Sequence, residues 1–397
     1  MKKRMLAVAV GLTVAMAGSP GWAENGNSPE IMQELQTLKT QNNKLNARIN
    51  RLEQKISEAE ETQARDEGAM GGTDSPLAQL NDKISLSGLI EVEAASAETF
   101  DDTDSSDISL ATVELSLDAA ISEWSSGHIL LKYEDGASLD VDEGTITIGN
   151  TDQYPLYLTV GKMYVPFGDF TSNMISDPLT LELGETNEDA LLVGFDREGF
   201  YGSVYVFNGD VEETGKDDMV RTMGANLGFS YEKEDINLDT GIGWISNIGD
   251  SDGLTDGLNL GAENDMDGQV RGFTAHLIYN HGQYGLITEY LQACKSFNAT
   301  ELAFNGQGAK PKAWNLELSQ TTEIKGRETT FAVAYQGTKE AVDLGLPESR
   351  YLGSVSFNLM NYTSLSLEYI RDKDYATNDG GTGNNAQALT MQLAVEF

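Results

Sequence analysis

An alternation of apolar and polar residues with a period of two runs from residue 83 to the end of the chain at residue 397. Residues 84–92 place isoleucine, leucine and valine on one parity and mainly serine and glutamate on the other, and residues 111–121 repeat the pattern. Successive side chains of a strand point to opposite faces. We therefore predict an all-β fold of many strands, each with one apolar and one polar face.

Eleven further stretches share this period: 155–165, 199–207, 221–233, 236–245, 270–280, 284–292, 312–319, 329–337, 350–359, 364–372 and 386–397. A soluble β-sandwich also alternates. However, many of these stretches reach ten residues or more, whereas soluble strands are commonly about five or six residues long. Strands of that length are typical of membrane-spanning barrels, so we predict a transmembrane antiparallel β-barrel.

Aromatic placement points to the same fold. Aromatic residues gather near the predicted strand ends, as the interfacial girdles of a membrane barrel would: Tyr154, Tyr157, Tyr164, Phe167, Phe170, Phe200, Tyr201, Tyr205 and Phe207. The last stretch carries Leu389, Met391, Leu393, Val395 and the terminal Phe397 on one face. A terminal aromatic strand resembles the assembly signal of outer-membrane barrels, and we assign that role to Phe397.

The barrel size follows from the length of residues 83–397. A spanning strand with its share of turn and loop uses about 20 residues, which gives about sixteen strands, with fourteen and eighteen as alternatives. A barrel of this size encloses an aqueous lumen, whereas an eight-stranded barrel is filled by side chains. The sequence therefore predicts a pore.

The N-terminal 82 residues have a different organisation. Three basic residues precede an apolar stretch from Met5 to Ala17, which predicts a cleavable signal peptide over residues 1–23, with cleavage after Ala17 as the alternative. Residues 24–62 predict a periplasmic coiled coil and residues 63–82 a flexible linker. The proposed oligomerisation residues occupy heptad positions: Ile31, Leu35, Leu38, Asn42, Leu45, Ile49, Leu52 and Ile56.

The charges that flank the heptad core predict a homo-oligomer. Glu34 with Lys39 and Arg48 with Glu53 are complementary only between identical parallel chains in register. Isoleucine and asparagine at core positions favour two chains, whereas a wide barrel favours three. We predict a trimer and leave a dimer open.

The composition limits the partners. The chain has 26 Lys and Arg against 63 Asp and Glu, a formal net charge of -37. Nucleic acid is therefore not an expected partner, since phosphate binding requires basic residues, and a phosphate channel would need rings of Arg and Lys. The expected partners are the lipid bilayer and lipopolysaccharide. Cys294 is the one cysteine, so no internal disulfide forms, and we expect it to lie inertly on a strand.

Catalytic residues are scarce. Among the three histidines, only His128 lies two residues from a serine, Ser126, as a hydrolase barrel would require, and no esterase or metalloprotease motif is present. We predict that the chain is not an enzyme, with an outer-membrane hydrolase as a remote alternative. His276 is expected to be an interfacial or lumen-wall residue.

Acidic clusters occur in several predicted loops, including residues 250–253 and 265–268. The densest contains Asp101, Asp102, Asp104 and Asp107. Carboxylates with this spacing can bind Ca²⁺, but none of the clusters matches a complete calcium loop. Hydrated surface loops that face cation-bridged lipopolysaccharide are the favoured interpretation. No cofactor is predicted, and Ca²⁺ bound at the four aspartates is the alternative interpretation.

A family resemblance rests on the segment Gly161-Lys162-Met163-Tyr164-Val165-Pro166-Phe167-Gly168. It resembles the corresponding segment of LbtU-family siderophore porins and, more loosely, of phosphate-selective-type porins. The order of signal, heptad helix, linker, barrel and terminal Phe397 is similar as well. The resemblance implies plug-independent passage of ferric siderophores. From the residues alone, Pro166 and Gly168 end a strand, and parity places Lys162 on the apolar face.

These patterns together predict an outer-membrane porin for passive passage of small solutes, with ferric siderophores as the expected cargo. A general or cation-preferring diffusion porin is the first alternative. A structural anchor, in which the coil reaches a periplasmic partner, is the second.

Overall fold

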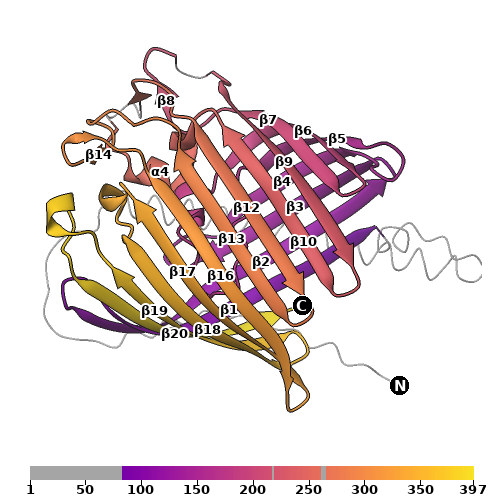
Figure 1. Cartoon of the computed structure of the whole chain (residues 1–397). Coiled ribbons are helices and arrows are strands. Elements are labelled where there is room, and N and C mark those ends of the chain that lie inside the picture. Colours follow the sequence, from indigo (N-terminus) through magenta and orange to yellow (C-terminus); the bar gives the residue numbers. More distant parts are fainter. Residues whose placement is uncertain (1–82, 217–218, 261–264) are drawn as a thin grey trace, which may run out of the picture. The chain divides into compact units, whose positions relative to one another are not determined.

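The structure is a computed structural model that describes residues 83–216, 219–260 and 265–397. The predicted signal peptide, coiled coil and linker lie outside the described residues. Sixteen strands form a closed barrel in which each strand pairs with its neighbours in chain order and the last strand, β20, pairs with the first, β1 (Figure 1). All pairs within the barrel are antiparallel. The predicted fold class and strand number are confirmed for the barrel.

The barrel strands are β1 Ile84–Glu98, β2 Asp104–Ser122, β3 Ser125–Glu134, β4 Asp140–Gly149, β5 Leu156–Tyr164, β6 Asn187–Arg197, β7 Phe200–Phe207, β9 Thr222–Lys233, β10 Ile236–Ile245, β12 Gly272–His281, β13 Tyr284–Ala293, β16 Lys312–Ile324, β17 Arg327–Lys339, β18 Ser349–Met360, β19 Thr363–Lys373 and β20 Asn385–Glu396. The loops carry β8 Glu212–Glu213, β11 Asp265–Met266, β14 Ala303–Phe304, β15 Gln307–Gly308, the helices α3 Leu181–Gly184 and α4 Asp252–Gly257, and three 3-10 turns, η1 Ile248–Asp250, η2 Val342–Leu344 and η3 Thr377–Asp379. No helix among these described residues is long and apolar enough to cross a membrane.

Thirteen of the sixteen strands coincide with the predicted alternating stretches, and β3, β4 and β6 do not. The register between β3 and β4 shifts at Leu130/Leu131. A bulge of this kind adds one residue on one strand, which breaks a strict alternation. The bulge accounts for β3 and β4. In β6 both faces are apolar, because Ala190 and Leu192 are buried in the core while Leu191 and Val193 are exposed, so no apolar-polar alternation appears there.

The outer face of the barrel is apolar. Leu389, Met391, Leu393 and Val395 are all exposed, as the alternation in the last strand predicted. Exposed aromatic residues also lie at both ends of the wall, at Trp124, Tyr154, Phe200, Tyr231, Tyr279, Tyr284 and Tyr362 near the short turns and at Tyr290, Tyr335, Tyr351 and Tyr369 near the long loops. These positions fit the two aromatic girdles of a membrane barrel.

Part of the predicted girdle was assigned wrongly. Phe167, Tyr205 and Phe207 are each 1% exposed and belong to an apolar core inside the barrel. This core also includes residues of the loop helices, such as Leu183 and Leu254. Aromatic residues near a strand end can face either side of the wall, and here loop segments that fold into the barrel cover the inward ones.

The terminal residue closes the seam between β1 and β20. The Phe397 amide donates to the Gly88 carbonyl at 3.0 Å, and the Gly88 amide donates to the Phe397 carbonyl at 2.8 Å. A side chain at Gly88 would collide with the Phe397 ring. The chain end is therefore fixed in the barrel wall by both backbone and ring contacts.

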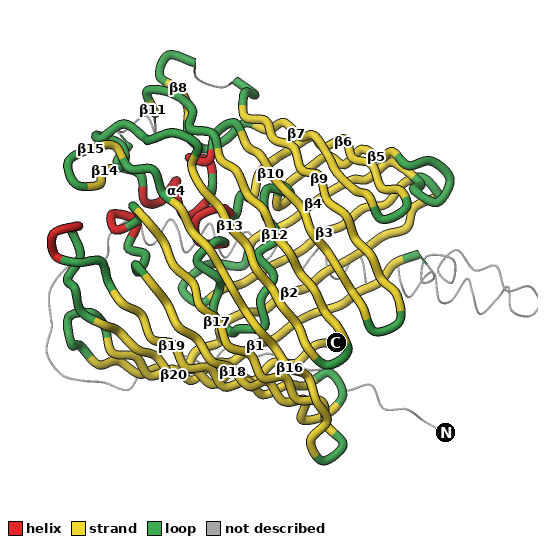
Figure 2. Tube along the Cα trace, viewed as in Figure 1, coloured by secondary structure: helices red, strands yellow, loops and turns green. Residues whose placement is uncertain are grey.

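The two ends of the barrel differ in their connections. At one end tight turns join the strands, as between β6 and β7 or β9 and β10. At the other end several connections are long, and three of them run from β5 to β6, from β10 to β12 and from β13 to β16 (Figure 2). The connection from β5 to β6, residues 165–186, turns into the barrel and is called the inward loop below.

Candidate functional site

The inward loop begins at the Pro166-Phe167-Gly168 segment. Strand β5 ends at Tyr164, and the next amide, that of Val165, donates to the Thr186 carbonyl at the far end of the loop at 2.9 Å. The Phe167 carbonyl then accepts a hydrogen bond from Thr274 Oγ1 on β12. A Cβ at Gly243 on β10 would collide with the same carbonyl. The segment thus ends a strand, as its residues predicted, and also seats the loop against the inner wall.

Two glutamates of the wall hold the middle of the loop. Glu317 on β16 accepts hydrogen bonds from the Asn173 amide at 3.0 Å and from Ser172 Oγ at 2.8 Å. Glu368 on β19 accepts one from the Ile175 amide at 2.7 Å. The two glutamates are 1% and 0% exposed. Hydrogen bonds to charged acceptors are the strong ones, so these side chains fix the loop across the lumen.

A third wall glutamate, Glu289 on β13, holds both limbs of the loop. It accepts from the Asp169 amide at 3.0 Å and from Thr180 Oγ1 at 2.9 Å. Glu289, Glu317 and Glu368 are called the anchoring glutamates below. The sequence analysis did not identify them, because each occupies an ordinary inward position of an alternating strand.

The end of the loop packs on a second inward segment. Ser251 Oγ donates to the Leu183 carbonyl of α3 at 3.0 Å, and the Asp252 amide of α4 donates to the Glu185 carbonyl at 2.9 Å. A Cβ at Gly253 would collide with the backbone of Glu182. The two short helices therefore form one unit inside the barrel, and the apolar core lies beneath them.

A cavity of about 850 Å³ remains between these loop segments and the strands β1–β6 and β20. Eight carboxylates and two lysines line it: Glu91, Glu93, Glu114, Glu134, Asp142, Asp177, Glu185, Asp252, Lys132 and Lys162. The four glutamates of β1, β2 and β3, namely Glu91, Glu93, Glu114 and Glu134, are called the acidic wall below. They face Asp177 and Glu185 of the inward loop across the cavity. The lining of this cavity is thus predominantly acidic.

Lys162 does not occupy the apolar face that parity predicted. It lines the cavity, and its Nζ donates to the Val141 carbonyl at 3.1 Å. The preceding residue, Gly161, has a φ of 129°, and a Cβ there would collide with the Gly144 backbone. This glycine, whose φ is positive, interrupts the alternation three residues before the strand ends at Tyr164, which explains why parity failed.

The acidic groups of the loops are partly withdrawn from water. Burial raises the pKa of Glu185 to about 7, and the nearby Asp252 carboxylate adds to that shift. Burial also raises the pKa of Asp252 to about 6 and the pKa of Asp177 above its ordinary value. The charge of the cavity therefore depends on pH in the neutral range.

The interpretation of the acidic clusters as hydrated surface loops is wrong for Asp250. This residue is 1% exposed and accepts hydrogen bonds from the Val211 amide, Thr222 Oγ1 and Asn247 Nδ2. Burial raises its pKa to about 6. Its carboxylate joins three chain segments and is a structural group rather than a surface charge.

The four aspartates considered for Ca²⁺ do not converge. Within the described residues, one group of at least three His, Cys, Asp or Glu side chains has the geometry to hold a metal ion, and it consists of Asp169, Asp239 and His276. Asp101, Asp102, Asp104 and Asp107 are not part of it. Calcium at these loop aspartates has no support in the geometry.

The histidines and the cysteine are also placed. His128 pairs with Asp118 at 2.7 Å rather than with Ser126. His276 lies on the inner wall, as expected, where its Nε2 is 3.0 Å from Asp239 Oδ1. Cys294 is exposed and directly follows β13, so it does not lie on a strand.

Comparison with curated protein sequences identifies homologues of this chain. No protein-family model matches the chain. A UPF0422 protein of Legionella pneumophila is 32% identical over 355 residues, which cover 79% of this chain and 66% of the relative. A UPF0422 protein of Coxiella burnetii is 27% identical over 320 residues, 76% of this chain and 67% of the relative. The UPF0422 proteins are homologues of this chain. The matched region spans about two thirds of their length.

Solved structures share the fold. OprB of Pseudomonas putida has a TM-score of 0.56 at 11% identity, and the match covers 84% of this chain and 97% of the OprB chain. The outer-membrane channel DcaP of Acinetobacter baumannii has a TM-score of 0.54 at 11% identity, and the match covers 83% of this chain and 100% of the DcaP chain. At this identity the likeness establishes a porin-like barrel fold and leaves the solute open.

Proposed function

We propose that this protein is an outer-membrane diffusion pore that prefers cationic and neutral solutes. The proposal rests on the cavity between the inward loop and the acidic wall, where eight carboxylates oppose two lysines. A lumen lined by one sign of charge concentrates ions of the opposite sign and repels like ions. Anionic solutes, including phosphate, therefore meet a repulsive field at this cavity.

The membrane location is part of the proposal. The apolar outer face, its two aromatic girdles and the predicted signal peptide support insertion into the outer membrane. Barrels of that membrane have short periplasmic turns and longer external loops. We accordingly place the tight turns and the predicted coil in the periplasm, with the long loops outside.

Lipopolysaccharide is the proposed partner of the outer rim. Lys312 and Lys339 are direct cross-strand neighbours on β16 and β17, and like charges in that position repel. Neither lysine forms an ion pair with another described residue. Trp314 and Tyr335 lie two and four residues away on the same strands, so a phosphate group between the lysines would rest beside an aromatic belt.

Ferric siderophores remain the specific cargo that the resemblance implies. The printed names of the homologues assign no solute. The acidic cavity supports passage of neutral or positively charged complexes and disfavours anionic ones. Siderophore passage is therefore proposed as one use of a cation-preferring pore rather than as its defining activity.

Assembly into a trimer is proposed from the predicted coil and the barrel size. One porin-like neighbour, OmpT of Vibrio cholerae, is described in a trimer form and has a TM-score of 0.51 at 12% identity. Mass determination of the intact complex in detergent tests the chain number. A trimer supports the proposal, and a dimer or monomer contradicts it.

Phe397 is proposed to be the assembly signal. Its deletion removes the ring over Gly88 and both seam hydrogen bonds, so we expect less heat-modifiable barrel with normal export. Normal assembly of the deletion would contradict this role.

Planar-bilayer recording tests the pore. The folded protein should form channels whose reversal potential in a KCl gradient indicates cation preference. Glu91→Gln with Glu114→Gln should reduce that preference, since both carboxylates line the cavity. A matched control, Glu198→Gln with Glu234→Gln, removes the same charge from two turns that do not line it. Absence of channels, or preference for anions, would overturn the proposal.

Vesicle uptake separates the solutes. Labelled ferric siderophores of different net charge are compared with unrelated solutes of similar size. Faster entry of siderophores than of size-matched solutes supports a siderophore porin, and equal entry supports general diffusion.

A further inference from the structure

Two rings lie flat on the inner wall because the neighbouring strands carry glycine. Tyr201 on β7 pairs with Gly228 on β9, which pairs with Gly241 on β10, which pairs with His276 on β12. A Cβ at Gly228 would collide with the Tyr201 ring, and a Cβ at Gly241 would lie 2.6 Å from the His276 ring. The two glycines thus form the floor on which the rings extend toward each other.

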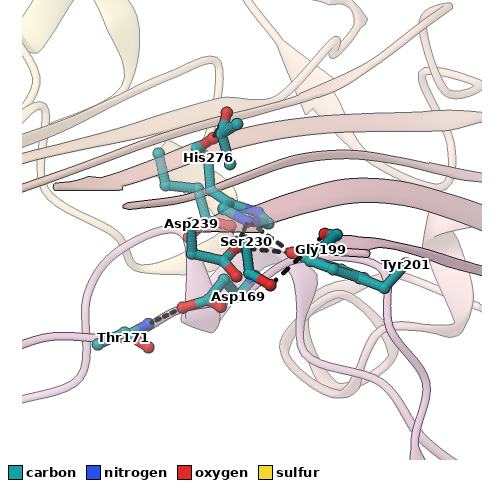
Figure 3. A network of polar contacts seen from close by, with 9 residues as sticks. Asp169, Thr171, Gly199, Tyr201, Ser230, Asp239 and His276 are labelled. Carbon is teal, nitrogen blue, oxygen red and sulfur yellow. Dashed lines mark hydrogen bonds and ion pairs between the residues drawn. The ribbon is translucent and has the colours of Figure 1, made fainter. Parts of the chain in front are cut away.

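The polar ends of both rings meet at one carboxylate (Figure 3). Tyr201 Oη donates to Asp239 Oδ1 at 2.6 Å, and His276 Nε2 lies 3.0 Å from the same oxygen. Asp239 is two residues before Gly241 on β10, so its side chain shares the inner face. The side chain of His276 is 11% exposed, which leaves it little freedom to turn away.

The inward loop supplies a second carboxylate. Asp169 lies directly after the Pro166-Phe167-Gly168 segment, and one donor atom from each of Asp169, Asp239 and His276 lies within 4.8 Å of the others. The backbone positions Asp169, because its amide donates to Glu289 and its Oδ1 accepts from the Thr171 amide at 3.2 Å. Asp169 is exposed, so the group opens toward the lumen.

We propose that Asp169, Asp239 and His276 bind one divalent first-row transition metal ion of the Zn²⁺ type. Zinc binds imidazole nitrogen and carboxylate oxygen at about 2.0–2.2 Å, so two ligands of one ion lie roughly 3 Å apart, as His276 Nε2 and Asp239 Oδ1 do. Imidazole favours transition metals over Ca²⁺ and Mg²⁺. No described Lys or Arg forms an ion pair with either aspartate.

The surrounding residues fit such a site. The Tyr201 hydroxyl holds the Asp239 carboxylate, in the manner of the supporting hydrogen bonds that orient metal ligands. Because Asp169 is exposed, water or a donor atom of a passing solute could complete the coordination on the lumen side. Because Asp169 belongs to the loop and the other two ligands belong to the wall, the ion would also tie the loop to β10 and β12.

Metal titration of the folded full chain in detergent tests the site. After removal of metal by a chelator, Zn²⁺ is titrated by calorimetry and Co²⁺ by its visible absorption. One equivalent should bind, and an excess of Ca²⁺ should not displace it. His276→Gln, Asp239→Asn and Asp169→Asn should each weaken binding at least tenfold, while Tyr201→Phe should weaken it roughly 10–100-fold, as loss of a supporting hydrogen bond does.

His128→Gln is the matched control. It alters the other His–Asp pair of the inner wall, in which His128 lies 2.7 Å from Asp118 without a third ligand, and it should leave the affinity unchanged. Asp169→Asn changes only an exposed loop side chain, so this variant should fold as the wild type does. Heat modifiability in gel electrophoresis checks the folding of every variant. No binding by the wild type, undiminished binding by Asp169→Asn, or displacement by Ca²⁺ would overturn the proposal. Channel activity is not part of the readout.

Discussion

The two sides of the inner wall use glutamate in opposite ways. On β1, β2 and β3 the acidic wall faces an open cavity, and its side chains keep contact with solvent. On β13, β16 and β19 the anchoring glutamates are at most 4% exposed and accept hydrogen bonds from the inward loop. Both sets occupy inward positions of alternating strands. Their difference is therefore imposed by the loop, which covers one side and leaves the other open.

The comparison separates two roles of negative charge in a pore. A carboxylate in the open cavity acts at a distance, through the field that it adds to the lumen. A buried carboxylate acts by contact, because an N–H donor that loses its partner costs free energy when water cannot replace it. Removing the first kind should change ion selectivity, and removing the second kind should change the shape of the pore.

The largest effect is expected from Glu317→Ala combined with Glu368→Ala. Each lost hydrogen bond to a charged group weakens the loop anchor by roughly 1.5–3 kcal/mol, and four residues of the loop lose such bonds. The middle of the loop should leave the lumen. We expect a higher single-channel conductance and faster proteolysis within residues 170–178.

Glu93→Ala with Glu114→Ala is the matched control for this double variant. It removes the same number of charges from the acidic wall, where neither residue bonds to the loop. Cation preference should fall while the proteolysis rate stays that of the wild type. Equal conductance in the two double variants would show that the glutamate pairs do not differ in role.

The contact between the inward loop and β10 should be almost as sensitive to substitution. Gly243→Ala places a Cβ against the Phe167 carbonyl, where the closest atom is rigid backbone, and overpacking of this kind costs about 1–3 kcal/mol. Gly353→Ala on β18 is the control, because nothing lies within 4 Å of a Cβ there. Denaturant unfolding in detergent should show a lower midpoint for Gly243→Ala alone. A loss of equal size in both variants would mean that the wall, and not the loop seat, is disturbed.

The sequence predicted the wall better than the loop. Lipid requires an apolar outer face on every strand, so Leu389, Leu393 and their equivalents impose a local period of two that can be read directly. The path of the inward loop depends on contacts between residues far apart, such as Asp169 and Glu289, which are 120 positions apart. Nothing in the strand pattern marks Glu289 as an anchor and Glu91 as a cavity residue.

The metal-binding group was hidden for a related reason. Its side chains come from β10, β12 and the inward loop. The predicted strand order makes β10 and β12 neighbours, but nothing in the strand pattern brings the inward loop to them. One signal was present, because glycine inside a strand often marks the close approach of another group, and Gly228 and Gly241 lie in β9 and β10. Similarly, the glycine at position 161 inside a predicted strand was a sequence signal for the irregular strand end at which Lys162 faces the cavity.

A smaller effect is expected from pH, and it separates the open side from the anchored side. Burial raises the pKa of Glu185 to about 7 and that of Asp252 to about 6, so both carboxylates gain protons as the pH falls from 8 to about 5. Cation preference should therefore decline over that range. Because the pKa of Glu185 is raised on folding, its contribution to stability is fully present when the pH is below the ordinary pKa of 4.5. This contribution is lost as the pH rises through about 7.

Reversal potentials measured across this pH range test the prediction. In Glu185→Gln the fall in cation preference near pH 7 should disappear, while the fall near pH 6 should remain. A wild-type preference that stays constant from pH 8 to pH 5 would contradict the assignment of these two groups to the conducting cavity.

The smallest effect is expected from Ser354→Ala on the anchored side. Ser354 Oγ on β18 donates to the Asn173 carbonyl at 3.1 Å, between the strands that carry Glu317 and Glu368. A neutral hydrogen bond contributes about 0.5–1.5 kcal/mol, and this one is exposed, so water can replace it. Hydrogen exchange in residues 170–178 should quicken by less than about tenfold, since tenfold corresponds to about 1.4 kcal/mol. Ser356→Ala removes a wall hydrogen bond to Ser366 that does not involve the loop, and loop exchange should not change. If Ser354→Ala released the loop as fully as the loss of the two glutamates, the anchor would depend on the number of contacts rather than on charge.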